Sequence, residues 1–429
     1  MRKIFQSVGP ALIVAAVVLG PGSILMSSVV GAKFGLVGFG VVVLVTILLI
    51  GMVALSARLG AVYEDSLCTE LAKRLGRPAA VTVGMVLFLM AALFQSSNNI
   101  ALVGGLEPML SSTESVSFGV RVSIIVAINC LVIGCLYCMQ NLYRFIESGM
   151  KVLIGLMALA FIVNFFIVFS SPVEKNLELT EGQPDWLPII GLIGTTFSVA
   201  GAFYQAYLVK EKGWGINEVK RGLTDSILST SILGLITAII LLASWRVFYG
   251  QEISLKTVDQ IARQLEPSFG SASKMIFCIG ILAGALSSFM VNAIIGGTVL
   301  SDSMGKGSRL KDRWPLHLST LALVIGMLVA IGSFYKEGST VHLITLAQAL
   351  TVIGVPALAL ALIYLGSQTE LKSERKIPRP LLALALVGLL VSCVVACFTI
   401  NKVYRKMIPQ DEKSIAWRQP VAGSLPRLF

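Results

Sequence analysis

The sequence predicts an all-α integral membrane protein that crosses the bilayer many times. Of its 429 residues, 55% are hydrophobic and only 13% are charged, whereas an ordinary soluble domain carries about 25% charged residues. So small a charged fraction cannot cover a water-facing surface of this size. The hydrophobic residues are gathered in long runs that short polar loops separate. These observations exclude a soluble globular domain, a disordered chain and a collagen-like chain.

Eleven runs have the length of a membrane-spanning helix, which needs about 20 mostly apolar residues. Each is too long and too uniformly apolar for a strand, and no soluble domain interrupts the chain, so we predict a single transmembrane domain over residues 1–429. The predicted spans are at about 9–31, 37–57, 79–104, 119–140, 145–170, 187–209, 223–248, 272–300, 316–335, 340–365 and 380–401.

The distribution of Lys and Arg predicts how the chain is oriented. These residues concentrate in alternate loops, at about 58–77, 144–151, 210–221, 306–313 and 372–379. Loops rich in Lys and Arg stay in the cytoplasm. We therefore predict a multi-pass protein of the plasma (inner) membrane, with a cytoplasmic N-terminus and, after eleven spans, an extracytoplasmic C-terminus. The basic tail, residues 402–429, is an exception to this charge rule.

No additional function is indicated by the net charge, the cysteines or the carboxylates. The charge of +11 is scattered over short loops, so nucleic acid is not an expected partner, and of the seven cysteines only Cys68 lies outside an apolar run. No GxxxxGK[ST] phosphate-binding motif occurs, so we expect transport driven by a gradient rather than by ATP. The carboxylates lie in or near loops, and Asp225, which opens the seventh span, is expected to cap a helix. We predict no enzyme activity and no cofactor; the expected partners are membrane lipid and a small ion or solute, with no prediction of oligomeric state.

Helix-breaking residues interrupt the first span near its middle. The chain reads Leu19-Gly20-Pro21-Gly22-Ser23 there. Proline removes a backbone donor, and glycine favours non-helical dihedral angles. In hydrocarbon, the freed backbone groups are tolerated only where protein or a water-lined cavity satisfies them. We predict an unwound segment at this point; a simple proline kink is the alternative.

The sixth span has a similar interruption without a proline. Small and polar residues cluster at its centre, among them Gly194, Thr195, Ser198 and Gly201. The two interruptions lie five spans apart, and broken helices at corresponding places are typical of inverted-repeat transporters with a site near the midplane. We predict a first repeat at about 9–170, a second at about 187–365, and an extra helix at 380–401.

Polar residues deep in three other spans indicate a cavity. Such groups usually face the bundle interior and bind one another, so structural hydrogen bonding is the alternative for any single one. The third span, however, has five in a row, which one helix can hide from lipid only if protein surrounds it. The residues are Gln95, Ser96, Ser97, Asn98 and Asn99 in the third span, Ser287, Ser288 and Asn292 in the eighth, and Gln348 and Thr351 in the tenth.

With these residues in view, the chain resembles the NRAMP (natural resistance-associated macrophage protein) family of divalent metal transporters. The segment from Val8 to Gly35 is similar to the family's opening helix with its DPGN break. The resemblance implies a LeuT-type fold: two inverted repeats of five helices, with helices 1 and 6 broken, and one extra helix. Further similar segments, in the family's order, are Ala57-Arg58-Leu59-Gly60, Leu265-Glu266-Pro267, Gly284-Ala285-Leu286-Ser287-Ser288 and Leu346-Ala347-Gln348.

At the substrate site the family's pattern is largely replaced. Gly20 and Ser23 occupy the places of the family's first-helix aspartate and asparagine. In the sixth helix, Ser198 stands for the metal-coordinating methionine and Thr195 for an alanine whose carbonyl assists. The tenth-helix glutamine is retained as Gln348. The resemblance thus implies that these five residues bind the substrate, with Ser23, Ser198 and Gln348 as the candidates for contact with a metal.

The family's proton-linked residues are replaced as well. Its third-helix acidic residues fall on Asn98 and Ala101, and its later sixth-helix histidine falls on Gln205. We therefore predict that Asn98, Asn99 and Gln205 line the cavity or a coupling route, and we do not expect proton coupling through the family's carboxylates.

These replacements favour a hydrated cargo. Carboxylate and thioether together suit a partly dehydrated manganese or iron ion, and Gly20 and Ser198 supply neither. Removing water from a divalent ion is very costly without a nearby negative charge, whereas hydroxyls, amides and carbonyls can contact the waters that magnesium retains. We predict an NRAMP-related secondary transporter of a divalent cation, more suited to hydrated magnesium than to dehydrated manganese or iron, that works by alternating access. The alternatives are a transporter of a neutral or anionic small solute and, in another class, a non-transporting membrane sensor or scaffold.

Overall fold

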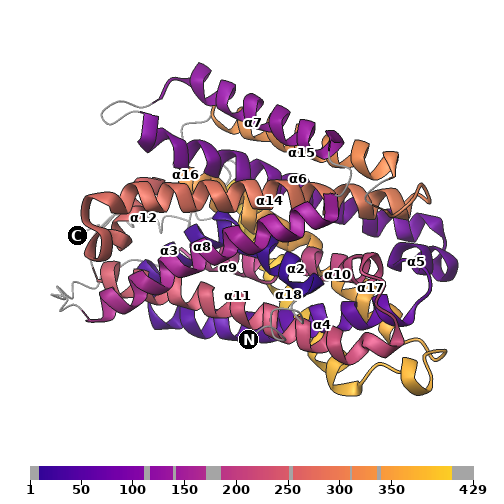
Figure 1. Ribbon diagram of the computed structural model, residues 1–429. Coiled ribbons are helices and arrows are strands. Elements are labelled where there is room, and N and C mark those ends of the chain that lie inside the picture. Colours follow the sequence, from indigo (N-terminus) through magenta and orange to yellow (C-terminus); the bar gives the residue numbers. More distant parts are fainter. Residues whose placement is uncertain are drawn as a thin grey trace, which may run out of the picture.

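The computed structural model describes residues 9–110, 116–138, 142–170, 185–250, 255–309, 312–335 and 340–407. Within these ranges every regular element is a helix, and the long helices lie side by side in one bundle (Figure 1). The predicted all-α membrane class is confirmed. Residues 1–8, most of the loop 171–186 and the tail from 408 lie outside the described residues.

The helices of the first half begin with two short segments in the first predicted span. They are α2 (Pro10–Val18), α3 (Pro21–Phe34), α4 (Leu36–Val62), α5 (Leu67–Leu75), α6 (Arg77–Leu110), α7 (Phe118–Cys138) and α8 (Leu142–Ser170). The helices of the second half are α9 (Leu187–Thr196), α10 (Val199–Glu211), α11 (Val219–Phe248), α12 (Val258–Ala262), α13 (Glu266–Phe269), α14 (Ser273–Ser303), α15 (Arg313–Ser333), α16 (Thr340–Thr351), α17 (Val355–Gly366) and α18 (Arg379–Met407).

Nine helical stretches among the described residues are long and apolar enough to cross a membrane. They correspond to nine of the predicted spans. The first predicted span is divided between α2 and α3, which are 9 and 14 residues long, and the fifth corresponds to α8. The count of eleven therefore stays a prediction.

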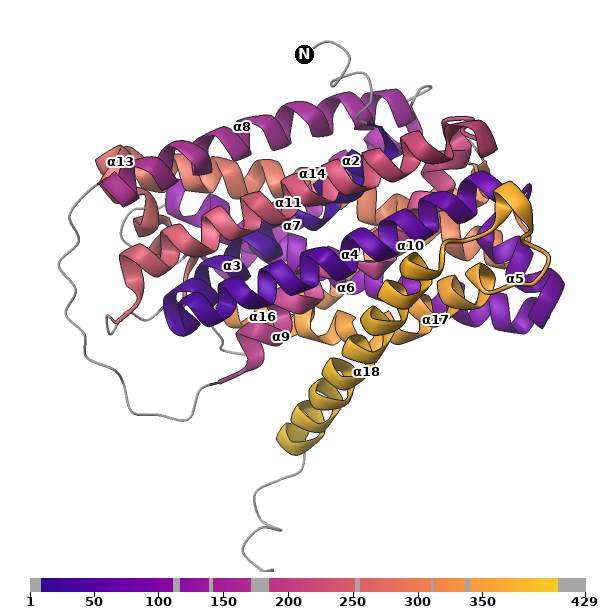
Figure 2. The same cartoon turned by 90° about the horizontal axis from the view of Figure 1, so that it is seen from below.

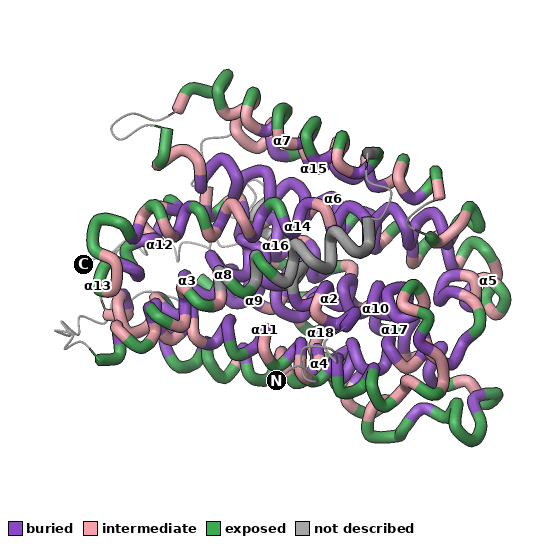
Figure 3. The backbone as a smooth tube through the Cα atoms, viewed as in Figure 1, coloured by how far each residue is buried: buried purple, intermediate pink, exposed green. Residues whose placement is uncertain are grey.

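The broken segments lie at the centre of the bundle. Nearly every residue of α9 and α10 is buried, and α3 is buried from Pro21 to Gly31 (Figure 3). Close backbone packing holds α3 in place, because a Cβ at Gly31 would lie only 2.2 Å from the backbone oxygen of Leu241 in α11. Only glycine permits this approach, so the long helix α11 supports the second half of the first broken span.

Three of the loops that the sequence predicts to be cytoplasmic gather at one end of the bundle. Arg58 donates hydrogen bonds to the backbone oxygens of Glu374 and Lys376 at 2.9 and 2.6 Å, and the Lys210 ammonium group donates to the backbone oxygens of Tyr63 and Glu64. The loops after α4, α10 and α17 are thereby tied together. This grouping agrees with the charge pattern; which end faces the cytoplasm stays a prediction.

The last helix ends at the opposite face. α18 lies obliquely against α4 and α17 (Figure 2), and Lys402, near its end, forms an ion pair with Asp185, two residues before α9. The basic start of the tail therefore lies beside the loop that the sequence predicts to be external, where a carboxylate offsets one of its charges. The ion pair therefore neutralises part of the positive charge of a segment that the charge rule alone would place in the cytoplasm.

Asp225 ties the start of α2 to α11. Its carboxylate accepts hydrogen bonds from the backbone nitrogens of Gly9 at 2.6 Å and Ala11 at 2.9 Å, and from the hydroxyl of Ser229. The side chain is 1% exposed. The first amides of a helix have no intrahelical acceptor and carry partial positive charge, so a buried carboxylate is a strong cap. Asp225 does cap a helix, as predicted, but the helix is α2 rather than its own, since α11 begins at Val219.

An Asp225→Asn exchange should destabilise the folded protein by about 1.5–3 kcal/mol, since hydrogen bonds to a charged acceptor contribute about that much. The amide has one acceptor oxygen instead of two and turns a donor toward the α2 amides. Thermal unfolding in detergent measures the effect. Asp65→Asn is the control, because Asp65 is half exposed and pairs with Lys73 at the surface, and it should change stability by less than about 1 kcal/mol. Equal effects of the two exchanges would contradict this role of Asp225.

Candidate substrate site

The first broken span is unwound where the sequence predicts it. α2 ends at Val18, and Leu19 leaves the helical region with φ −80° and ψ 35°. Gly20 is extended, with φ −75° and ψ 178°, and Pro21 begins α3. A proline at the first position of a helix costs no hydrogen bond, because that amide has no acceptor within the helix. The prediction of a break, rather than a kink, is confirmed.

The second break uses a serine cap in place of a proline. α9 ends at Thr196, and Phe197 and Ser198 have ψ values of 59° and 80°. The Ser198 hydroxyl accepts a hydrogen bond from the backbone nitrogen of Gly201 at 3.3 Å. Serine is a preferred N-cap because its oxygen satisfies one of the free amides. The small and polar residues of the sixth span therefore form the predicted break.

The tenth span, expected as one regular α-helix, contains a 3₁₀ turn. α16 ends at Thr351, a 3₁₀ turn follows at Val352–Gly354, and α17 begins at Val355. Pro356 lies at the start of α17, where its missing amide hydrogen is tolerated. The Gly354-Val355-Pro356 sequence was the available signal for this interruption.

A small cavity of about 10 Å³ lies between the two breaks. This is about the space that one buried water molecule needs. Its wall brings together all five predicted substrate-binding residues and one predicted coupling residue, Asn98. The lining residues are Val18, Gly20, Gly22, Ser23, Phe94, Asn98, Thr195, Ser198, Ser288, Asn292 and Gln348.

Two oxygen atoms of the cavity residues are buried and unpaired. Ser23 Oγ and Gln348 Oε1 have no hydrogen-bond partner in the described part of the chain, and each residue is 2% exposed. A buried polar atom without a partner costs about 1–3 kcal/mol, and such atoms are rare in proteins. Two unpaired oxygen atoms at one cavity could both be satisfied by a bound ligand or by water.

The cavity wall contains no carboxylate among the residues that the structure describes. Within the same residues, no group of three or more His, Cys, Asp and Glu side chains could hold a metal ion. The acceptors at the site are therefore hydroxyls, amide oxygens and the backbone oxygens that helix ends leave free. α2 and α9 both point their C-terminal ends at the breaks, and helix C-termini carry partial negative charge.

The polar run of the third span is divided between the cavity and the neighbouring helices. Gln95 donates to the backbone oxygen of Phe289 at 2.6 Å, and Asn98 donates to Gln95 Oε1 at 3.3 Å. Asn99, by contrast, accepts a hydrogen bond from Asn129 of α7 at 2.7 Å and is not among the cavity residues. The structure thus places Asn98 at the cavity and Asn99 in a helix–helix contact.

Gln205, the remaining predicted residue, lies in α10 two turns after Ser198 and is not among the cavity residues. It is fully buried, and neither its nitrogen nor its oxygen has a hydrogen-bond partner among the described residues. Its amide therefore leaves both a donor and an acceptor for water or a ligand.

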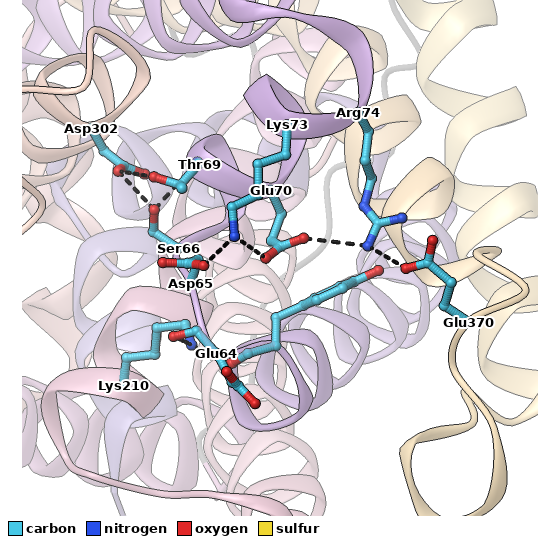
Figure 4. Close-up of polar contacts among 11 residues, drawn as sticks. Glu64, Asp65, Ser66, Thr69, Glu70, Lys73, Arg74, Lys210, Asp302 and Glu370 are labelled. Carbon is cyan, nitrogen blue, oxygen red and sulfur yellow. Dashed lines mark hydrogen bonds and ion pairs between the residues drawn. The ribbon is translucent and has the colours of Figure 1, made fainter.

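A second, larger cavity of about 700 Å³ opens at the end where the basic loops gather. The sequence did not predict it, because its walls come from segments far apart in the chain. Asp302 of α14 accepts hydrogen bonds from Ser66 at 2.7 Å and Thr69 at 3.1 Å (Figure 4). It also accepts a hydrogen bond from Tyr207 at 2.6 Å. Nearby, a hydrogen bond to Asp65 raises the pKa of Lys73. The three hydrogen bonds to the Asp302 carboxylate join α14 to α5 and α10.

Comparisons with known proteins show the family to which this chain belongs. Residues 11–402 match the family described as natural resistance-associated macrophage protein-like (Nramp). The chain is similar to the divalent metal cation transporter MntH of Mesorhizobium japonicum, with 23% identity over 94% of this chain and 89% of that protein. It is also similar to MntH of Agrobacterium fabrum, with 25% identity over 93% and 87% of the two chains.

Solved structures show the same fold at low identity. The crystal structure of the Eremococcus coleocola manganese transporter with an aromatic bis-isothiourea substituted compound has a TM-score of 0.73, with 16% identity over 95% of this chain and 89% of that chain. The structure of MhsT with L-phenylalanine has a TM-score of 0.58, with 16% identity over 91% and 97%. Both similarities agree with the predicted LeuT-type fold. Because the family match covers nearly the whole chain, this protein belongs to the Nramp family.

Proposed function

We propose that this protein is a secondary transporter of a divalent metal cation, which binds between the two breaks at Gly20, Ser23, Thr195, Ser198 and Gln348. The unpaired oxygens of Ser23 and Gln348 at one buried cavity carry this proposal. The C-terminal ends of α2 and α9 add partial negative charge, which favours a cation. The relatives named above are divalent metal cation transporters, which supports the same cargo class.

The cation is magnesium-like and keeps much of its water. Hydroxyl and amide oxygens can contact bound waters, and the described part of the cavity wall offers neither the carboxylate nor the thioether that would replace them. The cavity is too small for a hydrated ion, so the broken helices must move apart to admit one. Alternating access, in two repeats at about 9–170 and 187–365, provides this movement.

Uptake into proteoliposomes tests the proposal. Mg²⁺ uptake should be saturable, and Mn²⁺ should compete for it; empty liposomes are the control. Folded protein that transports none of the divalent cations would contradict the proposed function.

A neutral or anionic small solute is the second candidate. The N-terminal ends of α3 and α10 also meet the cavity, and such ends favour negative groups. A panel of small solutes in the same assay separates the candidates, since saturable solute uptake without divalent uptake would favour this cargo. No uptake of any compound would favour a sensor or scaffold.

Transport should be independent of proton movement. Over roughly pH 6 to 8, no Ser, Thr, Asn or Gln side chain titrates, and these are the polar side chains that the described cavity wall presents. The initial rate of Mg²⁺ uptake should change by less than about twofold over this range. A pH-sensitive dye inside the liposomes should report no acidification that follows uptake; acidification in proportion to uptake would contradict the prediction.

A further inference from the structure

We propose that Ser97 is a positioning residue that holds the Gln348 side-chain amide with its oxygen toward the substrate cavity. This inference rests on the proposed cation transport. It concerns a residue that is buried beside the cavity and is not one of its lining residues.

Gln348 is held closely between the two broken spans. A Cβ at Gly22 of α3 would lie 2.3 Å from Gln348 Nε2, and a Cβ at Gly194 of α9 would lie 2.5 Å from the Gln348 backbone oxygen. Neither distance is compatible with a side chain, so glycine is required at both positions unless Gln348 moves. The positions of the Gln348 backbone and of its amide group are therefore both fixed by packing. The side chain can still change by a rotation of the amide that exchanges its nitrogen and oxygen.

Ser97 gives one end of this amide a partner. Gln348 Nε2 donates to Ser97 Oγ at 2.7 Å, and Ser97 is 0% exposed. The adjacent Ser96 differs, because its hydroxyl donates to the backbone oxygen of Leu93 within the same helix. Ser97 is thus the serine of this pair that reaches across from α6 to α16.

This hydrogen bond determines what Gln348 presents to a ligand. With Nε2 bound to Ser97, the oxygen Oε1 is the free end of the amide, and it is buried without a partner in the described part of the chain. An amide oxygen accepts hydrogen bonds and binds cations, whereas the amide nitrogen only donates. Without Ser97, the amide nitrogen would have no partner in this orientation, and the amide would be free to turn its nitrogen toward the cavity. The N–H groups carry partial positive charge, so a nitrogen that faces the cavity would weaken the binding of a cation.

A Ser97→Ala exchange tests the role. The KM for Mg²⁺ uptake should rise about three- to tenfold, as expected for one lost hydrogen bond, with the maximal rate per folded protein changed by less than about twofold. Ser96→Ala, the same exchange at the neighbouring buried position, should leave both values within about twofold of the unmodified protein. A purely structural role would lower the maximal rate and leave KM unchanged; that result, or an unchanged KM and rate, would overturn the proposal.

The same exchange in a Gln348→Glu background separates orientation from packing. A carboxylate presents oxygen at both ends, so Ser97→Ala should then change KM by less than about twofold. An equal rise of KM in both backgrounds would overturn the proposal. Absence of any divalent uptake by the unmodified protein contradicts the proposed function itself, whereas uptake that is insensitive to Ser97→Ala contradicts only the role of Ser97.

Discussion

A Gly20→Asp exchange is expected to lower the KM for divalent cation uptake by about tenfold or more. Gly20 lines the cavity, and its φ of −75° and ψ of 178° lie in a region that every L-residue adopts. Aspartate therefore causes no backbone strain at this position, and it adds a fixed negative charge. An opposite charge at about 4 Å contributes about 4 kcal/mol at an effective dielectric constant of about 20, and part of this is offset by the desolvation of the carboxylate. A tenfold change corresponds to about 1.4 kcal/mol.

Gly20→Asn is the matched control, because asparagine has the shape of aspartate without its charge. Its KM should stay within about threefold of the unmodified protein, as for one neutral hydrogen bond. Uptake measured over a range of Mg²⁺ and Mn²⁺ concentrations gives both values. Equal effects of the two exchanges, or a higher KM for Gly20→Asp, would contradict a cation bound at this position. If the cargo is neutral or anionic, the aspartate should instead suppress uptake of that solute.

A Gly22→Ala exchange should reduce transport by about tenfold or more while the protein stays folded. The new methyl group would lie 2.3 Å from Gln348 Nε2 and 2.8 Å from its Cδ. Overpacking of this kind costs about 1–3 kcal/mol. The end of the Gln348 side chain must move, so the amide oxygen leaves its place at the cavity and the hydrogen bond to Ser97 is strained.

Gly40→Ala serves as the control for this exchange. Gly40 lies in α4, and a Cβ there would meet no described atom within 4 Å. Both variants should elute as monodisperse protein in detergent, and only Gly22→Ala should lose uptake per folded molecule. Normal uptake by Gly22→Ala would show that the position of Gln348 does not matter for transport.

The sequence predicts a helix break where the residues that cause it are neighbours in the chain. At Gly20 and Pro21 the backbone preferences are strong, and the break falls there. In the sixth span the signal is weaker, and the structure adds that Ser198 caps α10. The 3₁₀ turn at Val352–Gly354 was missed because hydropathy counts a glycine within an apolar run as part of the span, although Pro356 follows closely.

Side-chain partners were harder to predict because they depend on how distant segments pack. Asp225 was expected to cap a helix, but only the fold shows that α2, more than 200 positions away, receives the cap. Asn98 and Asn99 are neighbours in one polar run, yet one lines the cavity and the other binds α7. The cavity around Asp302 joins α4, α5, α10 and α14 and leaves no local pattern in the chain.

The most direct test of a cation held without a charged ligand is anomalous X-ray scattering from crystals of this protein grown with Mn²⁺ bound, so that the broken helices can open to admit the ion. Mn²⁺ is used here as a heavier substitute for Mg²⁺. We expect a peak between Ser23, Ser198 and Gln348. The protein oxygens should lie about 4 Å from it, as for an ion that contacts them through water, rather than at the roughly 2 Å of direct coordination. A peak coordinated directly by a carboxylate, or no peak between the two breaks, would contradict this expectation.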